Sequence, residues 1–162
     1  AITLVSTLWK GSTFSVHLPL VSKALRPEIE KKDDVPGGRE RVMFVDDELP
    51  LAEMGKDLLE SLGYDVTVKT GSMEALATFK HAPGHFDIII TDQTMPDMTG
   101  AELAREMIKI RADIPIILCT GYSTLIDDAT AKAIGIKDFV LKPLTKGSIA
   151  RLIRRALDDD DR

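Results

Sequence analysis

Several features that mark particular classes of protein are scarce in these 162 residues. A single cysteine, Cys119, excludes a disulfide within the chain, so nothing in the sequence requires an oxidising compartment. No run approaches the roughly 20 apolar residues of a membrane-spanning helix, and no signal peptide is recognisable. We therefore expect a cytoplasmic chain without direct membrane contact, which leaves the membrane attachment of a longer parent open.

Basic patches and glycine-rich turns are sparse too. The net charge of −5 and a pI near 5.2 argue against a nucleic-acid partner, because no basic stripe is present. No glycine-rich loop follows the first apolar run after residue 40, which argues against a flavin or dinucleotide site. His81 and His85 lack a third ligand nearby, so we expect loop residues rather than a metal pair. Cys119 stands in the most apolar run and is expected to be a buried core thiol.

Residues 21–38 mark the clearest boundary along the chain. They combine charges of both signs with two prolines and a Gly-Gly pair, and a stretch of this kind is expected to form a linker. Beyond it, short apolar runs alternate with longer helical patterns, which is typical of β-α units around a parallel sheet. We expect a short segment at 1–20, the linker at 21–38, one domain at 39–157 and a solvated acidic tail at 158–162.

Helix signals are readable between the apolar runs. Pro50 suits a first helical turn, and Ser72 is expected to cap a second helix. Thr99 and Glu102 match a capping box that opens a third. Two further helices are expected at 123–133, where the pattern is weakly amphipathic, and at 149–157. With five strands, this gives a five-stranded α/β domain.

Polar residues stand where the apolar runs end. In chain order these runs and the residues that follow them are 41–45 with Asp46 and Asp47, 86–91 with Asp92, 114–119 with Thr120, and 139–141 with Lys142. Ligands of an open parallel sheet bind beyond the carboxyl ends of its strands, so these side chains should meet at one edge. Residues 65–69 alternate between apolar and polar, as an edge strand with one wet face would.

This set of side chains suits a divalent metal and a phosphoryl group. Three clustered carboxylates disfavour joint ionisation, and Mg²⁺ relieves this because it prefers oxygen ligands. Asp92 is the best candidate nucleophile, since it stands alone after its run and a carboxylate can attack phosphorus. Asp47 would share the metal, Lys142 would neutralise charge, and Thr120 would hydrogen-bond to a phosphoryl oxygen. Taken singly, each acid has the alternative of capping a helix or facing solvent.

Four motifs together resemble the receiver domain of two-component response regulators. They are Phe44-Val45-Asp46-Asp47-Glu48, Asp92-Gln93-Thr94-Met95-Pro96-Asp97-Met98-Thr99-Gly100, Cys119-Thr120-Gly121-Tyr122 and Asp138-Phe139-Val140-Leu141-Lys142-Pro143. The resemblance implies a flavodoxin-like (βα)5 fold whose parallel five-stranded sheet has the order 2-1-3-4-5. It implies phosphorylation of Asp92 by a phosphohistidine of a histidine kinase or a phosphotransfer domain. It also implies Mg²⁺ on Asp47, Asp92 and the Thr94 carbonyl, with Asp46 assisting through water.

The same resemblance implies how the phosphoryl group would be read. Lys142 and Thr120 would hold its oxygens, and the Lys142–Pro143 peptide would be cis. Phe139 matches an aromatic switch that turns inward as Thr120 moves, with a static core phenylalanine as the alternative. The output would be a phosphorelay, which we favour, inhibition of an attached kinase, or recognition of the face built by the fourth helix, the fifth strand and the fifth helix.

Lys10-Gly11-Ser12-Thr13-Phe14-Ser15-Val16-His17-Leu18-Pro19 resembles the last strands of the ATP-binding domain of sensor histidine kinases. This resemblance implies that residues 1–20 are a remnant of that domain and that the parent is a bacterial hybrid kinase. The nucleotide motifs are absent, so this chain is not expected to bind ATP, and whether it counts as an enzyme stays open. The apolar face of such a hairpin also leaves a homodimer open.

Two other readings compete with a working receiver. The first is a degenerate receiver that acts only as a protein–protein interaction domain, against which the retention of all five site residues speaks. The second is a Mg²⁺-dependent phosphatase of the haloacid-dehalogenase type, which also uses an aspartyl phosphate. Members of that class carry an Asp-x-Asp motif after the first strand, whereas Asp46, Asp47 and Glu48 are consecutive here.

Overall fold

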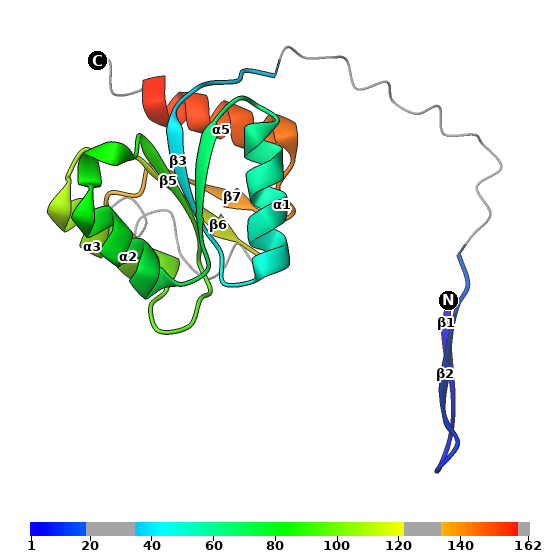
Figure 1. Cartoon of the computed structure of the whole chain (residues 1–162). Coiled ribbons are helices and arrows are strands. Elements are labelled where there is room, and N and C mark those ends of the chain that lie inside the picture. The colour runs from blue at the N-terminus through cyan, green and yellow to red at the C-terminus, as the bar shows by residue number, and fades with distance from the viewer. Residues whose placement is uncertain (19–34, 122–133, 159–162) are drawn as a thin grey trace. The chain divides into compact units, whose positions relative to one another are not determined.

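The computed structural model describes residues 1–18, 35–121 and 134–158. Its contacts divide the chain into two units, Ala1–Asp33 and Asp34–Arg162 (Figure 1). The first unit holds an antiparallel hairpin of β1 (Ile2–Thr7) and β2 (Gly11–Val16). The pairs Ile2–Val16 and Leu4–Phe14 give this hairpin one apolar face, and all four side chains are exposed.

The second unit is built on a parallel five-stranded sheet. Its strands are β3 (Arg41–Val45), β4 (Asp65–Lys69), β5 (Ile88–Asp92), β6 (Ile116–Thr120) and β7 (Asp138–Leu141). The strand order is β4-β3-β5-β6-β7, which is 2-1-3-4-5 when counting starts at β3. The predicted fold and strand order are therefore confirmed, and the 65–69 strand lies at an edge as expected. The order reverses between β3 and β5, so their carboxyl ends form the switch point where ligands bind.

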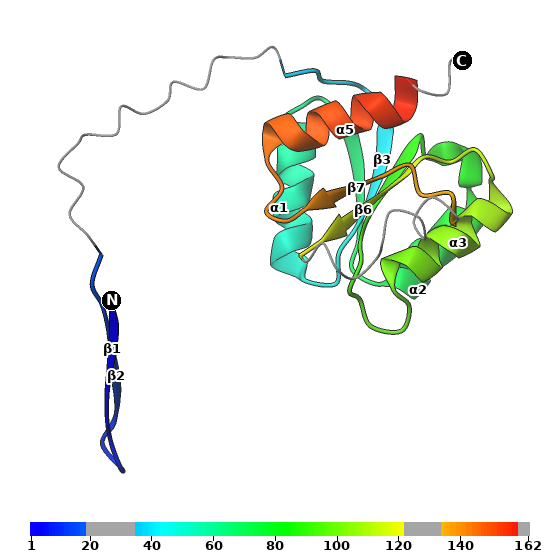
Figure 2. The same ribbon diagram turned by 180° about the vertical axis from the view of Figure 1, so that it is seen from behind.

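Helices cover both faces of this sheet (Figures 1 and 2). On one face lie α1 (Leu49–Glu60) and α5 (Lys146–Asp158), and on the other lie α2 (Ser72–His81) and α3 (Gly100–Ile110). A short 3-10 helix, η1 (Pro83–His85), follows α2. Successive strand residues point to opposite faces, so Met43 and Ile89 join one core cluster while Phe44 and Ile90 join the other. Both faces of the central strands are thereby buried.

The helix signals of the sequence have mixed outcomes. Pro50 lies in the first turn of α1, and Thr99 and Glu102 form both hydrogen bonds of the predicted capping box on α3. The prediction that Ser72 caps α2 is wrong, because the N-cap is Gly71 and Ser72 is the first helical residue. The Ser72 hydroxyl instead donates to the Pro96 carbonyl at 3.1 Å, outside its own helix. The predicted helix at 123–133 and residues 159–162 of the predicted tail lie outside the described residues.

The residues before β3 already belong to the second unit. Val35 packs against the core cluster on the α1 and α5 side, and the Gly38 amide donates to the Leu62 carbonyl at 3.1 Å. The boundaries 1–20, 21–38, 39–157 and 158–162 stay predictions. Within the described ranges, none of the helices is long and apolar enough to cross a membrane.

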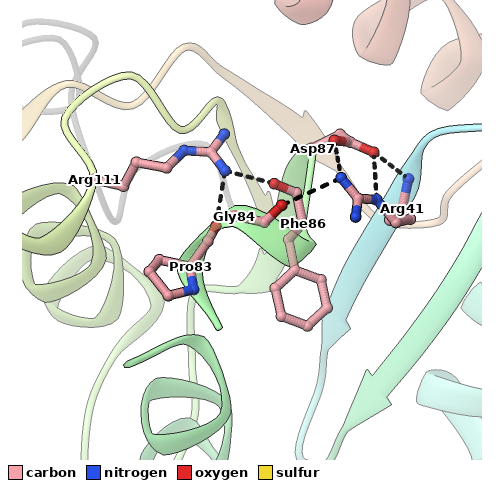
Figure 3. Close-up of polar contacts among 6 residues, drawn as sticks. All are labelled: Arg41, Pro83, Gly84, Phe86, Asp87 and Arg111. Atoms are coloured by element: carbon pink, nitrogen blue, oxygen red, sulfur yellow. Dashed lines mark hydrogen bonds and ion pairs between the residues drawn. The ribbon is translucent and has the colours of Figure 1, made fainter. Parts of the chain in front are cut away.

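An ion-pair network closes the amino ends of β3 and β5 (Figure 3). The main-chain amide and the guanidinium of Arg41 both donate to the Asp87 carboxylate, at 2.8 to 3.1 Å. Arg111 donates to the main-chain carbonyls of Pro83 at 2.8 Å and Phe86 at 2.7 Å. The hydrogen bonds from Arg41 outweigh partial burial and lower the pKa of Asp87. This end of the sheet is therefore tied together by two arginines.

Candidate functional site

The carboxyl ends of four strands bring the predicted site residues to one edge. Asp46 follows β3, Asp92 ends β5, Thr120 ends β6 and Lys142 follows β7. Asp46, Asp92 and Thr120 are buried, with exposures of 2%, 7% and 8%. Polar side chains this deep need partners, since an unpaired buried charge is costly.

Lys142 is the shared partner of the two aspartates. Its ammonium donates to Asp46 Oδ2 at 2.8 Å and lies 2.7 Å from Asp92 Oδ1. Burial lowers the pKa of Lys142, but the hydrogen bonds to both carboxylates outweigh this and raise the pKa to about 12. Lys142 is therefore a fixed positive charge between two buried carboxylates.

Each carboxylate also has a main-chain donor on its other oxygen. Asp46 Oδ1 accepts from the Glu48 amide at 3.0 Å, and Asp92 Oδ2 accepts from the Thr94 amide at 2.8 Å. These bonds fix the rotation of both side chains, so that one oxygen of each faces Lys142. The nucleophile expected from the sequence is thus held in a defined orientation.

Gly100, the first residue of α3, explains how that helix approaches Asp92 so closely. A Cβ atom on Gly100 would lie 2.1 Å from the Asp92 carbonyl oxygen, which no side chain can tolerate. A glycine is therefore required at the end of the 92–100 motif for steric reasons, which the sequence alone did not reveal.

Thr120 and Phe139 occupy the places expected of a switch pair. The Lys142 amide donates to the Thr120 carbonyl at 2.8 Å, so these two site residues share a main-chain bond. Phe139 lies on β7 and its side chain is 40% exposed, and its role as a switch stays a prediction. The expected cis peptide between Lys142 and Pro143 is confirmed.

Lys142 joins two of the three carboxylates expected from the sequence, Asp46 and Asp92. Asp47 is only partly buried, Thr94 is exposed, and in the described part of the chain no group of three Asp, Glu, His or Cys side chains is placed to hold a metal. The donor set nevertheless fits a hard cation, because oxygens of Asp46 and Asp92 converge on one ammonium. The metal roles of Asp46, Asp47, Asp92 and Thr94 stay predictions.

An apolar cavity opens beside the two charged residues. Its volume is about 330 Å³, and it lies between α1 and the segment 142–144 that follows β7. Asp46 and Lys142 contribute to its wall together with Phe44, Leu51, Met54, Gly55, Leu58, Pro143 and Leu144. The site therefore has a roomy apolar approach on its α1 side.

Cys119 lies on β6 directly beside Asp92 of β5 in the sheet register. Burial raises the pKa of its thiol to about 12, as expected for a core cysteine. The prediction of a buried thiol is confirmed, and this thiol contributes no reactive sulfur to the site.

Comparison with known proteins identifies the family to which this arrangement belongs. The sequence profile of the family described as "Response regulator receiver domain" matches residues 42–154, which include all of the site residues above. The chain belongs to the response regulator receiver family. It is thus a receiver domain of two-component signalling, with Asp46, Asp92, Thr120 and Lys142 at the expected strand ends.

The sensor protein ArcB of Escherichia coli, which is named for aerobic respiration control, is similar over nearly the whole chain. It is 32% identical over 164 residues, which cover 99% of this chain but 21% of ArcB. This chain thus spans about a fifth of the length of that relative. The match extends beyond the receiver, because 99% coverage includes residues of the hairpin unit.

Solved structures agree with the fold. A receiver domain protein from Clostridium thermocellum is 29% identical with a TM-score of 0.71, covering 75% of this chain and 97% of that one. The receiver of the sensor histidine kinase PA1611 from Pseudomonas aeruginosa, described with magnesium in its active-site cleft, is 23% identical. Its TM-score is 0.66, with 75% of this chain and 99% of that chain covered, which is a likeness of fold.

Sequence reasoning missed Gln93 as a residue of interest. It follows Asp92 and is 9% exposed, and its side-chain oxygen accepts a hydrogen bond from the Ala101 amide at 3.2 Å. No local signal singles it out, since Gln93 stands among the polar residues Thr91, Asp92 and Thr94, and its partner lies eight residues further along the chain.

Proposed function

We propose that this receiver accepts a phosphoryl group on Asp92 from a phosphohistidine. The observation that carries the proposal is the Asp46–Lys142–Asp92 contact, in which a buried carboxylate is held beside a cation at the carboxyl edge of the sheet. Phosphoryl transfer depends mainly on positioning and on neutralising charge, and this arrangement supplies both.

The step itself is an in-line displacement at phosphorus. A carboxylate oxygen of Asp92 forms the new O–P bond while the P–N bond to the donor imidazole breaks. The electron pair of that bond stays on nitrogen, and the ring leaves as neutral imidazole because its other nitrogen carries a proton. Lys142 already lies 2.7 Å from Asp92 Oδ1, so its charge is in place to pair with a phosphoryl oxygen. No proton has to move onto Asp92 in this step.

Mg²⁺ is the cofactor that the donor set favours. Asp46, Asp47, Asp92 and the Thr94 carbonyl would hold it, because Mg²⁺ takes oxygen ligands and keeps several waters. When bound, the metal supplies positive charge to the phosphoryl oxygens as negative charge develops there. The Asp46 and Asp92 oxygens that now face Lys142 are free to accept a second cation on their remaining lone pairs.

Phosphorylation would be read through Thr120 and Phe139. The Thr120 hydroxyl would bond to a phosphoryl oxygen, a contact that exists only after phosphorylation. Phe139, now 40% exposed, would then turn inward. The output is proposed to be the face of the fourth helix, β7 and α5, of which the fourth helix lies outside the described residues.

The parent is proposed to be a hybrid sensor histidine kinase. Two observations support this: the 32% identity to a sensor protein extends over 99% of the chain, and residues 1–18 form the hairpin expected of the last kinase strands. Mg²⁺ dependence, the donor histidine, a cytoplasmic location and a homodimer through the hairpin remain proposals. Mass in solution with and without residues 1–38 tests the homodimer.

The alternative is a degenerate receiver used only for protein–protein contact. The geometry speaks against it, since an unused site has no physical reason to bury Asp46 and Asp92 around one lysine. Retention of this costly arrangement favours chemistry over simple recognition.

Intact mass after incubation with acetyl phosphate tests the proposal. In this reaction the acyl O–P bond of the donor breaks and acetate leaves. We expect a gain of one phosphoryl group that requires Mg²⁺ and is lost in Asp92→Asn, whose amide is a poor nucleophile. If the folded wild type gains no phosphoryl group and binds no Mg²⁺, the degenerate receiver is the better account.

A further inference from the structure

Gln93 occupies a position that links the nucleophile strand to the next helix. Its amide donates to the Cys119 carbonyl at 2.8 Å, which extends the β5–β6 pairing one residue past Asp92. Its carbonyl accepts from the Gly100 amide at 3.0 Å, and its side-chain oxygen accepts from the Ala101 amide at 3.2 Å. The acceptor must be the amide oxygen Oε1, because a main-chain amide can only donate.

Through these contacts Gln93 supplies acceptors for two of the four main-chain amides at the start of α3 that have no partner within the helix. The first four amides of a helix have no partner within it and need one outside. Gln93 satisfies the amides of Gly100 and Ala101, while the capping box of Thr99 and Glu102 satisfies the amides of those two residues. Gln93 therefore shares the capping of this helix with the capping box, and of these residues only Gln93 adjoins Asp92.

The same contacts close the base of the loop between β5 and α3. The loop residue Thr94 donates its amide to Asp92 Oδ2 at 2.8 Å, so the loop holds the carboxylate that is to be phosphorylated. Gln93 lies between Asp92 and Thr94 and is 9% exposed. Burial alone would favour an apolar side chain at this position, because a buried amide group costs free energy unless it is hydrogen-bonded. The amide of Gln93 is therefore explained by the hydrogen bond that it accepts from Ala101.

We propose that Gln93 is a positioning residue for the phosphorylation of Asp92. Its side-chain oxygen anchors the loop to α3 and thereby fixes the Thr94 amide, which in turn orients the Asp92 carboxylate. This inference rests on the proposed function of Asp92. A merely structural role would stabilise α3 without affecting the rate at which Asp92 reacts.

The test compares two variants that weaken the same helix end. Gln93→Leu removes the side-chain acceptor next to Asp92, and Thr99→Ala removes the capping box, whose hydrogen bonds join Thr99 and Glu102 and do not involve Asp92. Both are made in the full chain, and both are assayed for unfolding free energy and for the rate of phosphoryl gain from acetyl phosphate at saturating Mg²⁺. Gln93→Met is a second variant without the acceptor, and Gln93→Glu keeps an acceptor oxygen.

Gln93→Leu and Gln93→Met are expected to lower the rate roughly threefold to tenfold, the size of one lost neutral hydrogen bond. Thr99→Ala should reduce stability but leave the rate within about twofold of wild type, and Gln93→Glu should recover most of the rate. Equal rates for wild type and Gln93→Met, or an equal slowing in Thr99→Ala, would overturn the inference. A wild type that gains no phosphoryl group would instead refute the proposed function.

Discussion

The two ends of the central sheet carry ion pairs that differ in charge balance and in burial. At the amino end, Arg41 faces one carboxylate, Asp87, and its guanidinium and amide satisfy both oxygens. At the carboxyl end, one ammonium, that of Lys142, faces two buried carboxylates, Asp46 and Asp92. The first group is neutral and closed, whereas the second keeps one negative charge in excess.

This difference separates structure from chemistry. A neutral pair with all of its hydrogen bonds formed has nothing left to bind, so the amino end is expected to contribute to stability alone. An uncompensated negative charge in a buried place attracts a further cation. The excess charge at the carboxyl end is thus the physical basis for the proposed Mg²⁺ and phosphoryl chemistry.

The largest expected effect comes from Lys142→Met, which removes the only charge that compensates Asp46 and Asp92 among their described contacts. We expect a loss of about 2–3 kcal/mol in unfolding free energy without Mg²⁺, less than for a fully buried pair because the Lys142 side chain is 25% exposed. Denaturant unfolding in chelator measures this. The rate of phosphoryl gain from acetyl phosphate should also fall strongly, because Lys142 no longer neutralises charge at the phosphoryl group.

Mg²⁺ provides the control for that variant. Because the metal would replace the missing cation, it should stabilise Lys142→Met more than wild type. Equal stabilisation of both proteins, or none, would show that the excess charge does not recruit the metal.

Arg111→Met tests the opposite end of the sheet. It leaves the Pro83 and Phe86 carbonyls without their charged donor, which should cost about 1.5–3 kcal/mol in unfolding free energy. The rate of phosphoryl gain in the folded protein should stay unchanged. If the fully folded variant reacted much more slowly than wild type, the claim that the amino end contributes to stability alone would be wrong.

Asp87→Asn should have a smaller, pH-dependent effect. The pKa of Asp87 is lowered from 3.8 in the folded chain by its hydrogen bonds to Arg41. A lowered pKa stabilises the folded state above the ordinary value, and this contribution is lost as pH falls through the folded value. The variant should therefore be less stable than wild type by about 1 kcal/mol or less at pH 7, since the Asp87 side chain is 34% exposed.

Unfolding curves of wild type and Asp87→Asn at several pH values measure that dependence. The gap in unfolding free energy between them should shrink below the ordinary pKa of the aspartate. A constant gap across the acid range would contradict the ion pair as its cause.

The smallest expected effect concerns Cys119, which lies beside Asp92 but is sealed from solvent. With its pKa raised to about 12 by burial, its thiol should react with a thiol reagent far more slowly in the native chain than in denaturant. Rapid labelling of the native chain would show that the sheet beneath the site is open to water.

The sequence predicted those features that depend on local pattern. Strand ends with Asp46, Asp92 and Lys142, the capping box at Thr99 and the buried Cys119 all follow from periodicity and residue type along a short stretch. The receiver resemblance added the strand order, which no local pattern determines.

What the sequence missed depends on contacts between distant residues. Arg41 and Asp87 are 46 positions apart, so their pairing is not visible in a local window. The sequence did predict that Lys142 lies near Asp46 and Asp92, but not that one ammonium would contact both carboxylates. Ser72 has the residue type of a cap, but the Pro96 carbonyl competes for its hydroxyl. Each of these outcomes is set by how β-α units pack, which propensity alone does not encode.

The most direct test of the central claim is to locate the phosphoryl group after reaction with acetyl phosphate and Mg²⁺. Borohydride reduces an acyl phosphate to an alcohol, so peptide mapping by mass reveals which aspartate carried it. We predict modification of Asp92 alone, both in wild type and in Asp87→Asn. Modification at Asp46, Asp47 or Asp87 instead, or loss of the reaction in folded Asp87→Asn, would contradict the account.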